Sequence, residues 1–119
     1  MKAKEIYENA LALDISRTDE EDDMEYFALR LLNILLAEVH CYNNQIREKH
    51  GREKLAQPCR VAQMEDDIGC EEEMYAPLSY GLAAKLLTAQ EETALATIYN
   101  NQYVTLLEMV TPALKVEVV

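Results

Sequence analysis

Transition metals bind in proteins to imidazole and thiol groups, and this sequence carries five of them: His40, Cys41, His50, Cys59 and Cys70. Zinc sites usually show close ligand pairs, such as two cysteines or two histidines separated by about two to five residues. The only close pair here is His40 with Cys41, and adjacent residues of a helix point about 100° apart. The spacing therefore argues against a structural metal. Three cysteines at unpatterned spacings also do not predict a disulfide framework.

The acid-rich stretch that follows Leu13 offers oxygen ligands for calcium. Four of its residues match ligand positions of an EF-hand loop: Asp14, Ser16, Thr18 and Glu25. The sixth position of such a loop is glycine because the chain turns sharply there, but Asp19 occupies it here, and no second copy follows. A helix start explains the stretch better, because Thr18 and Glu21 match the reciprocal capping pattern. We therefore expect no calcium site.

The sequence contains none of the common motifs of enzyme active sites. There is no glycine-rich phosphate loop, no G-x-S-x-G elbow and no H-E-x-x-H pair. Paired carboxylates occur in acidic runs, where solvation leaves the carboxyl pKa ordinary. Glu38 lies in an apolar stretch and could act as a buried base, but we expect it to meet an arginine instead, with these candidates: Arg30, Arg47 and Arg60. The sequence thus predicts a protein without enzyme activity and without a cofactor.

Composition and periodicity predict a single all-α domain. Glycine and proline are scarce, with three residues of each among 119, which favours helix. Apolar residues at three- and four-residue steps predict four helices, at about 2–13, 22–49, 71–87 and 89–110. The residues between the second and third helices, 50–70, read as a long irregular loop, and 113–119 alternate like a strand. The expected fold is a compact bundle of about four helices with a long middle loop and a short strand-like tail.

The second predicted helix is unusually apolar. Between Met24 and Lys49 its polar residues form one thin stripe, and leucines cover most of the remaining surface. Exposing that surface would cost about 25 cal/mol per Å², so we expect this helix to be central or shared with another subunit. The alternating tail could pair with an edge of a neighbouring copy. The expected subunit contacts are these: Leu29, Leu32, Leu36, Leu114, Val116 and Val118.

The last predicted helix begins with a second capping pattern, Thr88 followed by Glu91. Its expected core stripe consists of these residues: Leu95, Ile98, Tyr99, Leu106, Met109 and Val110. The helix contains no basic residue between Glu91 and Thr111. A recognition helix that binds DNA needs such residues, so a helix-turn-helix regulator is not expected.

The net charge of −11 argues against nucleic acid as a partner. Affinity for nucleic acid depends largely on lysine and arginine beside the phosphates, so we expect no specific nucleic-acid partner. No apolar run approaches the ~20 residues that cross a bilayer, and the first ten residues lack the apolar centre of a signal peptide. We therefore expect no membrane partner and a reducing, cytoplasmic environment.

Several segments together resemble a known group: IYENALAL, ALRLLNILLAEV, YAPLSYGLAAKLL and NNQYV. With them the chain resembles the small helical head–tail connector (adaptor or neck) proteins of tailed bacteriophages and prophages. The residues that carry the resemblance most specifically are these: Tyr80, Gly81, Leu82, Ala83, Ala84, Asn100, Asn101 and Tyr103. The resemblance implies a mostly helical, non-enzymatic subunit of virion assembly that forms rings beneath the portal. It also implies other neck proteins on the portal side as partners, the bacterial cytoplasm as the place of assembly, and the virion as destination if the phage is active.

The acidity supports an alternative class, a small acidic cytoplasmic binding protein. An antitoxin-like protein or a DNA-mimic inhibitor would cover a basic surface with carboxylates gathered on one face. Such a protein would be a stable monomer or dimer. The mass of the protein across a concentration range separates this class from a connector that forms higher oligomers.

Overall fold

Helices make up most of the computed structural model, which describes residues 1–13 and 22–111. Within these ranges the chain is all-α, as predicted, and forms five α-helices: α1 (Ala3–Leu13), α2 (Asp22–Glu38), α3 (His40–Lys49), α4 (Tyr75–Ala89) and α5 (Thr93–Val110). One turn of 3₁₀ helix, η1 (Glu72–Met74), precedes α4. The described ranges contain no strand, only an isolated bridge between Lys2 and Asp67. The predicted strand-like tail, 113–119, and the cap of Thr18 with Glu21 lie outside the described residues.

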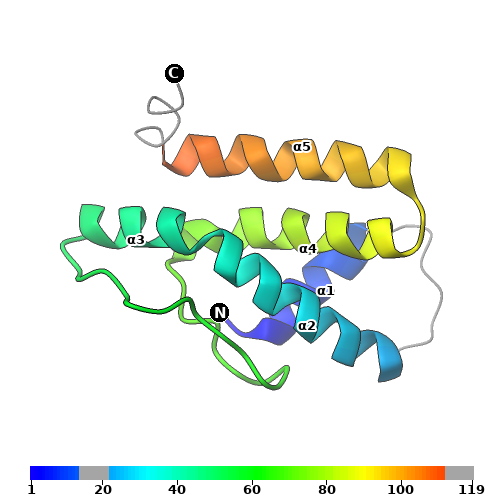
Figure 1. Ribbon diagram of the computed structural model, residues 1–119, viewed down its shortest axis with the longest axis horizontal. Coiled ribbons are helices and arrows are strands. Elements are labelled where there is room, and N and C mark those ends of the chain that lie inside the picture. Colours follow the sequence, from blue (N-terminus) through cyan, green and yellow to red (C-terminus); the bar gives the residue numbers. More distant parts are fainter. Residues whose placement is uncertain (14–21, 112–119) are drawn as a thin grey trace.

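The predicted helix 22–49 is divided in two at Val39. Its backbone there has φ −93° and ψ 5°, and the axes of α2 and α3 run in different directions (Figure 1). Neither proline nor glycine lies at this kink, so its cause is tertiary. α2 packs against α4 and α1, whereas α3 buries Ile46 in the core and bonds Asn43 and Asn44 to the segment that follows it.

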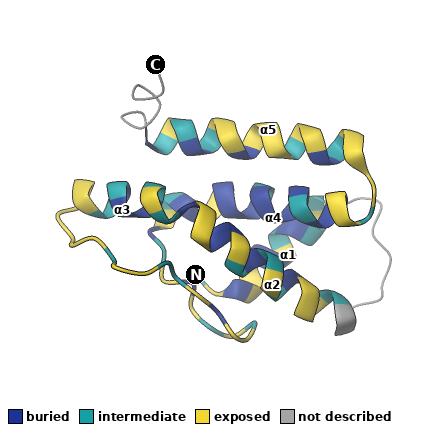
Figure 2. Ribbon diagram, viewed as in Figure 1, coloured by how far each residue is buried: buried dark blue, intermediate teal, exposed yellow. Residues whose placement is uncertain are grey.

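The central element is α4 rather than the stretch from Met24 to Lys49. α4 contacts α1, α2, α5 and η1, and most of its residues are buried, whereas α5 lies on one side of it and is largely exposed (Figures 1 and 2). Its fully enclosed apolar side chains include these: Leu78, Leu82, Ala83, Leu86 and Leu87. The reason is side-chain size, since a helix can be approached closely on several sides only where small residues separate the large ones.

Neighbouring helices approach α4 closely at Gly81. A Cβ atom added there would lie 2.9 Å from Leu35 Cδ1 of α2 and 2.9 Å from Tyr103 Cδ1 of α5. Both distances are shorter than van der Waals contact between carbon atoms. The absence of a side chain at Gly81 thus lets α2 and α5 pack against the same turn of α4.

The turn from α4 to α5 differs from the predicted one. The helix predicted from residue 89 begins at Thr93, and Glu92 before it makes no side-chain capping hydrogen bond. The Thr88 hydroxyl instead donates to the Ala84 carbonyl within α4 at 2.8 Å. Chain reversal is achieved by Glu91, whose φ of +64° lies in the left-handed region. The cap predicted from Thr88 and Glu91 is therefore wrong.

The buried face of α5 is narrower than its sequence predicts. Ala96, Tyr103 and Leu107 are buried, but Ile98 and Met109, both predicted in the core stripe, are exposed. α5 has α4 as its main neighbour, and one neighbouring helix covers only one stripe of an α-helix. The outer face of α5 is consequently apolar and uncovered over part of its length.

Candidate functional site

The long segment after α3 is attached to α2 and α3 by asparagine side chains. Asn44 exchanges two hydrogen bonds with the Leu55 backbone, at 2.8 and 3.0 Å. Asn33 does the same with Val61, at 2.9 and 2.8 Å. The Glu71 N–H donates to Asn43 Oδ1 at 2.9 Å. A side-chain amide that satisfies both backbone groups of a residue replaces the partner that a strand would supply, so this segment is ordered by its own chain.

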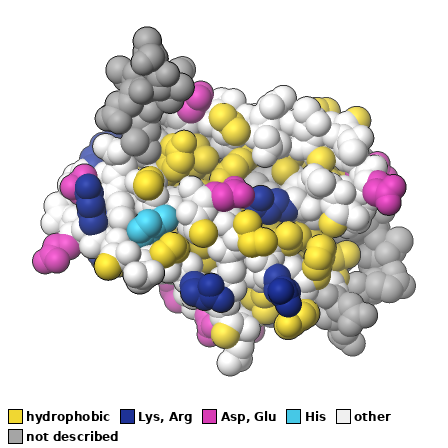
Figure 3. All heavy atoms as spheres, viewed as in Figure 1, with side chains coloured by type: hydrophobic (Ala, Val, Ile, Leu, Met, Phe, Trp, Pro, Cys, Tyr) yellow, Lys and Arg dark blue, Asp and Glu magenta, His cyan; other side chains and the backbone are white. Residues whose placement is uncertain are grey.

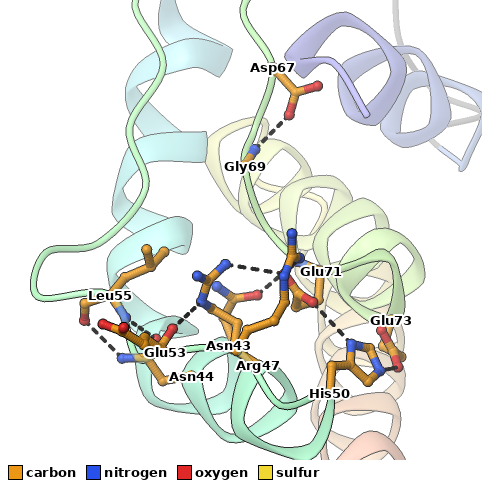
Figure 4. A network of polar contacts seen from close by, with 11 residues as sticks. Asn43, Asn44, Arg47, His50, Glu53, Leu55, Asp67, Gly69, Glu71 and Glu73 are labelled. Carbon is orange, nitrogen blue, oxygen red and sulfur yellow. Dashed lines mark hydrogen bonds and ion pairs between the residues drawn. The ribbon is translucent and has the colours of Figure 1, made fainter.

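A buried carboxylate lies where this segment reaches η1. The side chain of Glu71 is 4% exposed, and three cationic groups surround it (Figure 4). Glu71 Oε2 accepts from Arg52 Nη1 at 2.8 Å and from Arg47 Nη1 at 3.4 Å. Glu71 Oε1 lies 3.0 Å from His50 Nδ1. We call Arg47, His50, Arg52 and Glu71 the Glu71 cluster.

The pKa values within the cluster follow from its geometry. Burial alone raises the pKa of Glu71, but the hydrogen bonds from His50 and Arg52 and the charges of Arg52 and Arg47 outweigh it, so the pKa is lowered. The hydrogen bond to Glu71 and the nearby Glu73 carboxylate raise the pKa of His50 despite some desolvation. Both shifts favour the charged forms, as expected of an ion-pair cluster.

These shifts predict a pH window of greatest stability. The stabilisation from His50 is fully present below about 6.5, the ordinary pKa of histidine, and is lost as the pH rises through its raised folded-state pKa. The stabilisation from Glu71 is present above about 4.5 and is lost as the pH falls through its lowered folded-state pKa. Melting temperatures should therefore be highest between about pH 4.5 and 6.5.

His50→Gln should abolish the fall in melting temperature above about pH 6.5. The matched variant His40→Gln should show the same fall as the native protein. Thermal melts of both variants and the native protein, followed by circular dichroism across the pH range, provide the measurement. An unchanged decline in His50→Gln would assign the upper limit to another group.

The cluster has the features of a structural clamp. His50 Nε2 also contacts Glu73 at 2.8 Å, so both of its ring nitrogens face carboxylates. Acid–base catalysis needs a nitrogen that can reach a substrate.

The sequence prediction that carboxylates here lie only in solvated runs is wrong for Glu71. No signal in the sequence distinguishes Glu71 from Glu72 or Glu73, because its partners lie 19 to 24 residues away.

Glu38 also differs from its prediction. It is exposed rather than buried, and its partners differ from the three predicted arginines. Glu38 Oε2 lies 2.9 Å from Lys85 Nζ, and Glu38 Oε1 accepts from the Tyr103 hydroxyl at 3.2 Å. Burial and the adjacent Glu38 charge raise the pKa of Tyr103. Glu38 therefore connects α2 to both α4 and α5 at the surface.

Beside this contact, an open groove of about 640 Å³ runs between α2 and α5 with α4 as its floor. It is lined by these residues: Leu31, Ile34, Ala84, Lys85, Thr88, Ala89, Thr93, Ala96, Thr97 and Asn100. Hydrophobic side chains gather in a band on this face, between α5 and α2 (Figure 3). Lys85 is the only charged residue among the described residues of the lining, and Glu38 neutralises it. We call this surface the α2–α5 groove.

The residues of the connector-like motif lie at the contact of α4 with α5. Tyr80 stacks edge-on against Tyr99, with ring centroids 5.8 Å apart, and Gly81 meets the Tyr103 ring. Leu82 and Ala83 are buried in the core. Ala84 and Asn100 line the α2–α5 groove, whereas Asn101 is exposed. The structure thus gathers these residues on α4 and on the part of α5 beside it, where Asn100 and Asn101 are both exposed.

The residues of α2 that were predicted to contact another subunit are buried or partly buried within the monomer. Leu32 and Leu36 are each 1% exposed and belong to the core of the monomer, so in this conformation they are unavailable to another copy. Leu29 is partly buried against the same core. The remaining predicted contacts lie outside the described residues: Leu114, Val116 and Val118. The exposed large hydrophobic residues of α2 are instead Tyr26, Phe27 and Ile34.

Ligand-binding features are few in the part of the chain that the structure describes. Within it, no group of three or more histidine, cysteine or acidic side chains is arranged to hold a metal ion. None of the described helices has the length and apolar character required to span a membrane.

Comparisons of the chain with models of protein families, with curated proteins and with solved structures found no match.

Proposed function

We propose that this protein is a non-enzymatic structural subunit that binds a second copy of itself through the α2–α5 groove. The observation that carries the proposal is the charge of this surface. The chain has 22 acidic and 11 basic residues, yet the groove contains one lysine, and that lysine is paired. Two copies with the same negative charge repel each other least where their surfaces are neutral.

The shape of the groove supports the same occupant. Small side chains such as Ala84, Ala89 and Ala96 line the hollow, and Ile34 stands at its wall with 53% of its surface exposed. A protruding apolar side chain beside a hollow of small residues makes the surface complementary to itself. Such self-complementarity is what a contact between identical subunits requires.

The finer proposal is that the assembly is a head–tail connector of a phage or prophage, in which the protein takes part in virion assembly and meets other neck proteins on the portal side. It is supported by the resemblance carried by the Tyr80–Ala84 motif. Motif residues Ala84 and Asn100 contribute to the groove, which links the resembling residues to the surface proposed for assembly. Genes for a portal protein or a terminase beside this gene would support this finer proposal, and their absence would count against it.

A pair of variants tests the role of the groove in self-association. Ile34→Glu places a carboxylate in the groove and should weaken self-association at least roughly tenfold. Ile98→Glu is the matched control, because Ile98 is 59% exposed on α5 but does not line the groove, and it should have little effect. Light scattering on a sizing column across a concentration range gives the masses.

The same measurement separates an assembly subunit from the alternative class, a small acidic binding protein. Concentration-dependent oligomers that Ile34→Glu dissociates and Ile98→Glu retains would support the assembly subunit. A native protein that stays monomeric at every concentration would contradict self-association through the groove. Equal effects of the two variants would place the contact elsewhere.

A further inference from the structure

Arg30 is an exposed cation on α2 that forms no ion pair with any of the described residues. Its Nη1 donates to the Tyr26 hydroxyl at 3.4 Å, and its guanidinium carbon lies 5.8 Å from the centroid of the Tyr26 ring. A cation beside an aromatic ring is held in place without being neutralised. Arg30 is therefore oriented and available to a carboxylate of another molecule.

Helical spacing relates Arg30 to the α2–α5 groove. Ile34 stands at the wall of this groove with 53% of its surface exposed. Arg30 precedes Ile34 by four residues and Glu38 follows it by four, so all three lie on one face of α2. Both charged residues are exposed. Each is displaced from Ile34 by about 6 Å along the helix axis, in opposite directions.

A closed contact between two identical copies usually has two-fold symmetry. An axis that passes beside Ile34 and is perpendicular to α2 places the two α2 helices antiparallel. A residue four positions before Ile34 in one copy then faces the residue four positions after Ile34 in the other. Arg30 of each copy thus meets Glu38 of the other, and the contact forms twice. A parallel arrangement would place Arg30 against Arg30, which like-charge repulsion disfavours.

The uncharged residues of this face fit the antiparallel arrangement as well. Leu31 lies three residues before Ile34, and Ala37 lies three residues after it. The arrangement therefore sets a large side chain against a small one on each side of the axis. Leu31 lines the groove, and Ala37 is exposed. Complementary sizes at paired positions permit close packing.

Glu38 has acceptor capacity for a further cation. Its Oε2 lies 2.9 Å from Lys85 Nζ, and its Oε1 accepts from the Tyr103 hydroxyl at 3.2 Å. A carboxylate offers about four lone-pair sites, so these two contacts orient the group and leave sites for an arginine. Lys85 and the incoming Arg30 then place two cations around one carboxylate. This local positive charge offsets part of the repulsion between two copies of net charge −11.

We propose that Arg30 and Glu38 determine how two copies of the chain associate, by pairing reciprocally across a two-fold axis that sets their α2 helices antiparallel over the α2–α5 groove. This inference rests on the proposed self-association and names the residues that direct it. Within the monomer Arg30 contacts Tyr26 at the surface, so its removal leaves the fold intact and weakens the association.

Two charge-reversal variants test the pairing, because each one alone brings like charges together at both contacts. Arg30→Glu sets a carboxylate against Glu38, and Glu38→Arg sets an arginine against Arg30. Each variant alone should associate at least roughly tenfold more weakly than the native protein. In an equimolar mixture, each contact again joins a carboxylate to an arginine, so association should return as mixed pairs. Light scattering on a sizing column measures the masses, and an affinity tag on one variant shows whether the recovered species contains both.

Arg60→Glu is the matched control. Arg60 is exposed on the segment between α3 and η1 and does not line the groove, and its reversal changes the net charge by the same amount as Arg30→Glu. It should weaken association far less than Arg30→Glu does. Mixing it with Glu38→Arg should not restore mixed pairs. Circular dichroism checks that the three variants fold.

The outcomes separate this inference from the proposal on which it rests. A native protein that stays monomeric, or whose association survives Ile34→Glu, would overturn both. If Ile34→Glu dissociates the native pair but Arg30→Glu weakens it no more than Arg60→Glu does, the reciprocal pairing alone is wrong. Folded variants that do not recover association on mixing would also overturn the pairing. Should Glu38→Arg fail to fold because Lys85 loses its partner, the comparison of Arg30→Glu with Arg60→Glu still decides.

Discussion

We expect Gly81→Val to lose about 3 kcal/mol of the free energy of unfolding. Already the Cβ of any side chain here would lie 2.9 Å from Leu35 and from the Tyr103 ring. Leu35 is fully buried and Tyr103 nearly so, so neither has space into which to move, and overpacking of a dense core costs about 1–3 kcal/mol or more. The higher helix propensity of valine over glycine recovers only a few tenths of a kcal/mol.

Ala76→Val is the matched control for this variant. Ala76 is exposed on the same helix, so the substitution adds valine to α4 without a clash and should change stability by less than about 1 kcal/mol. Urea denaturation followed by circular dichroism measures both variants. Equal stabilities of the two would show that α2 and α5 do not close on α4 at Gly81.

The second large effect is expected from Glu71→Gln, which should lose about 2 kcal/mol. Removing one partner of a buried ion pair typically costs about 3–5 kcal/mol. The loss is smaller here because Arg52 and His50 remain partly exposed, with 57% and 40% of their side chains accessible, and water can solvate them. Glutamine keeps the shape of glutamate, but it loses the charge and directs one amide N–H₂ group toward arginine donors.

Glu72→Gln is the control, since Glu72 is the exposed neighbour of Glu71. It removes the same charge from the same short stretch and should leave stability nearly unchanged. Denaturant unfolding near pH 6 measures the difference, because both Glu71 and His50 are charged there in the native protein. A loss of the same size in Glu72→Gln would attribute the effect to net charge rather than to the Glu71 cluster.

Gly81 and Glu71 differ in how far the sequence marks their roles. Gly81 lies beside the small residues Ala83 and Ala84 in the sequence, and such residues permit close approach of a neighbouring helix. The structure identifies the two side chains that a Cβ at Gly81 would meet, Leu35 and Tyr103. Glu71 is one of three consecutive glutamates, and nothing local marks it as buried. Its partners come from the end of α3 and the loop after it, so only the three-dimensional path of the chain selects it.

For the apolar surface of α2, too, the sequence indicates one part of the outcome and the packing of the helices decides the rest. The sequence shows that the 24–49 stretch has more apolar surface than one neighbour can cover, but not which residues stay uncovered. The structure buries Leu32, Leu35 and Leu36 and leaves Ile34 exposed. A helical period assigns residues to faces, whereas the position of the neighbouring helix decides which face is covered.

By itself, the sequence determined that the chain is helical, approximately where its helices lie and that its charge is strongly negative. These properties depend on residue type and on contacts three or four residues apart, which are local. Only the tertiary structure decided that α4 is central, that the chain bends at Val39, and that Glu71 is buried among Arg47, His50 and Arg52. Those outcomes depend on packing between segments distant in the chain, where the small difference in free energy among alternative arrangements is not written in any single stretch.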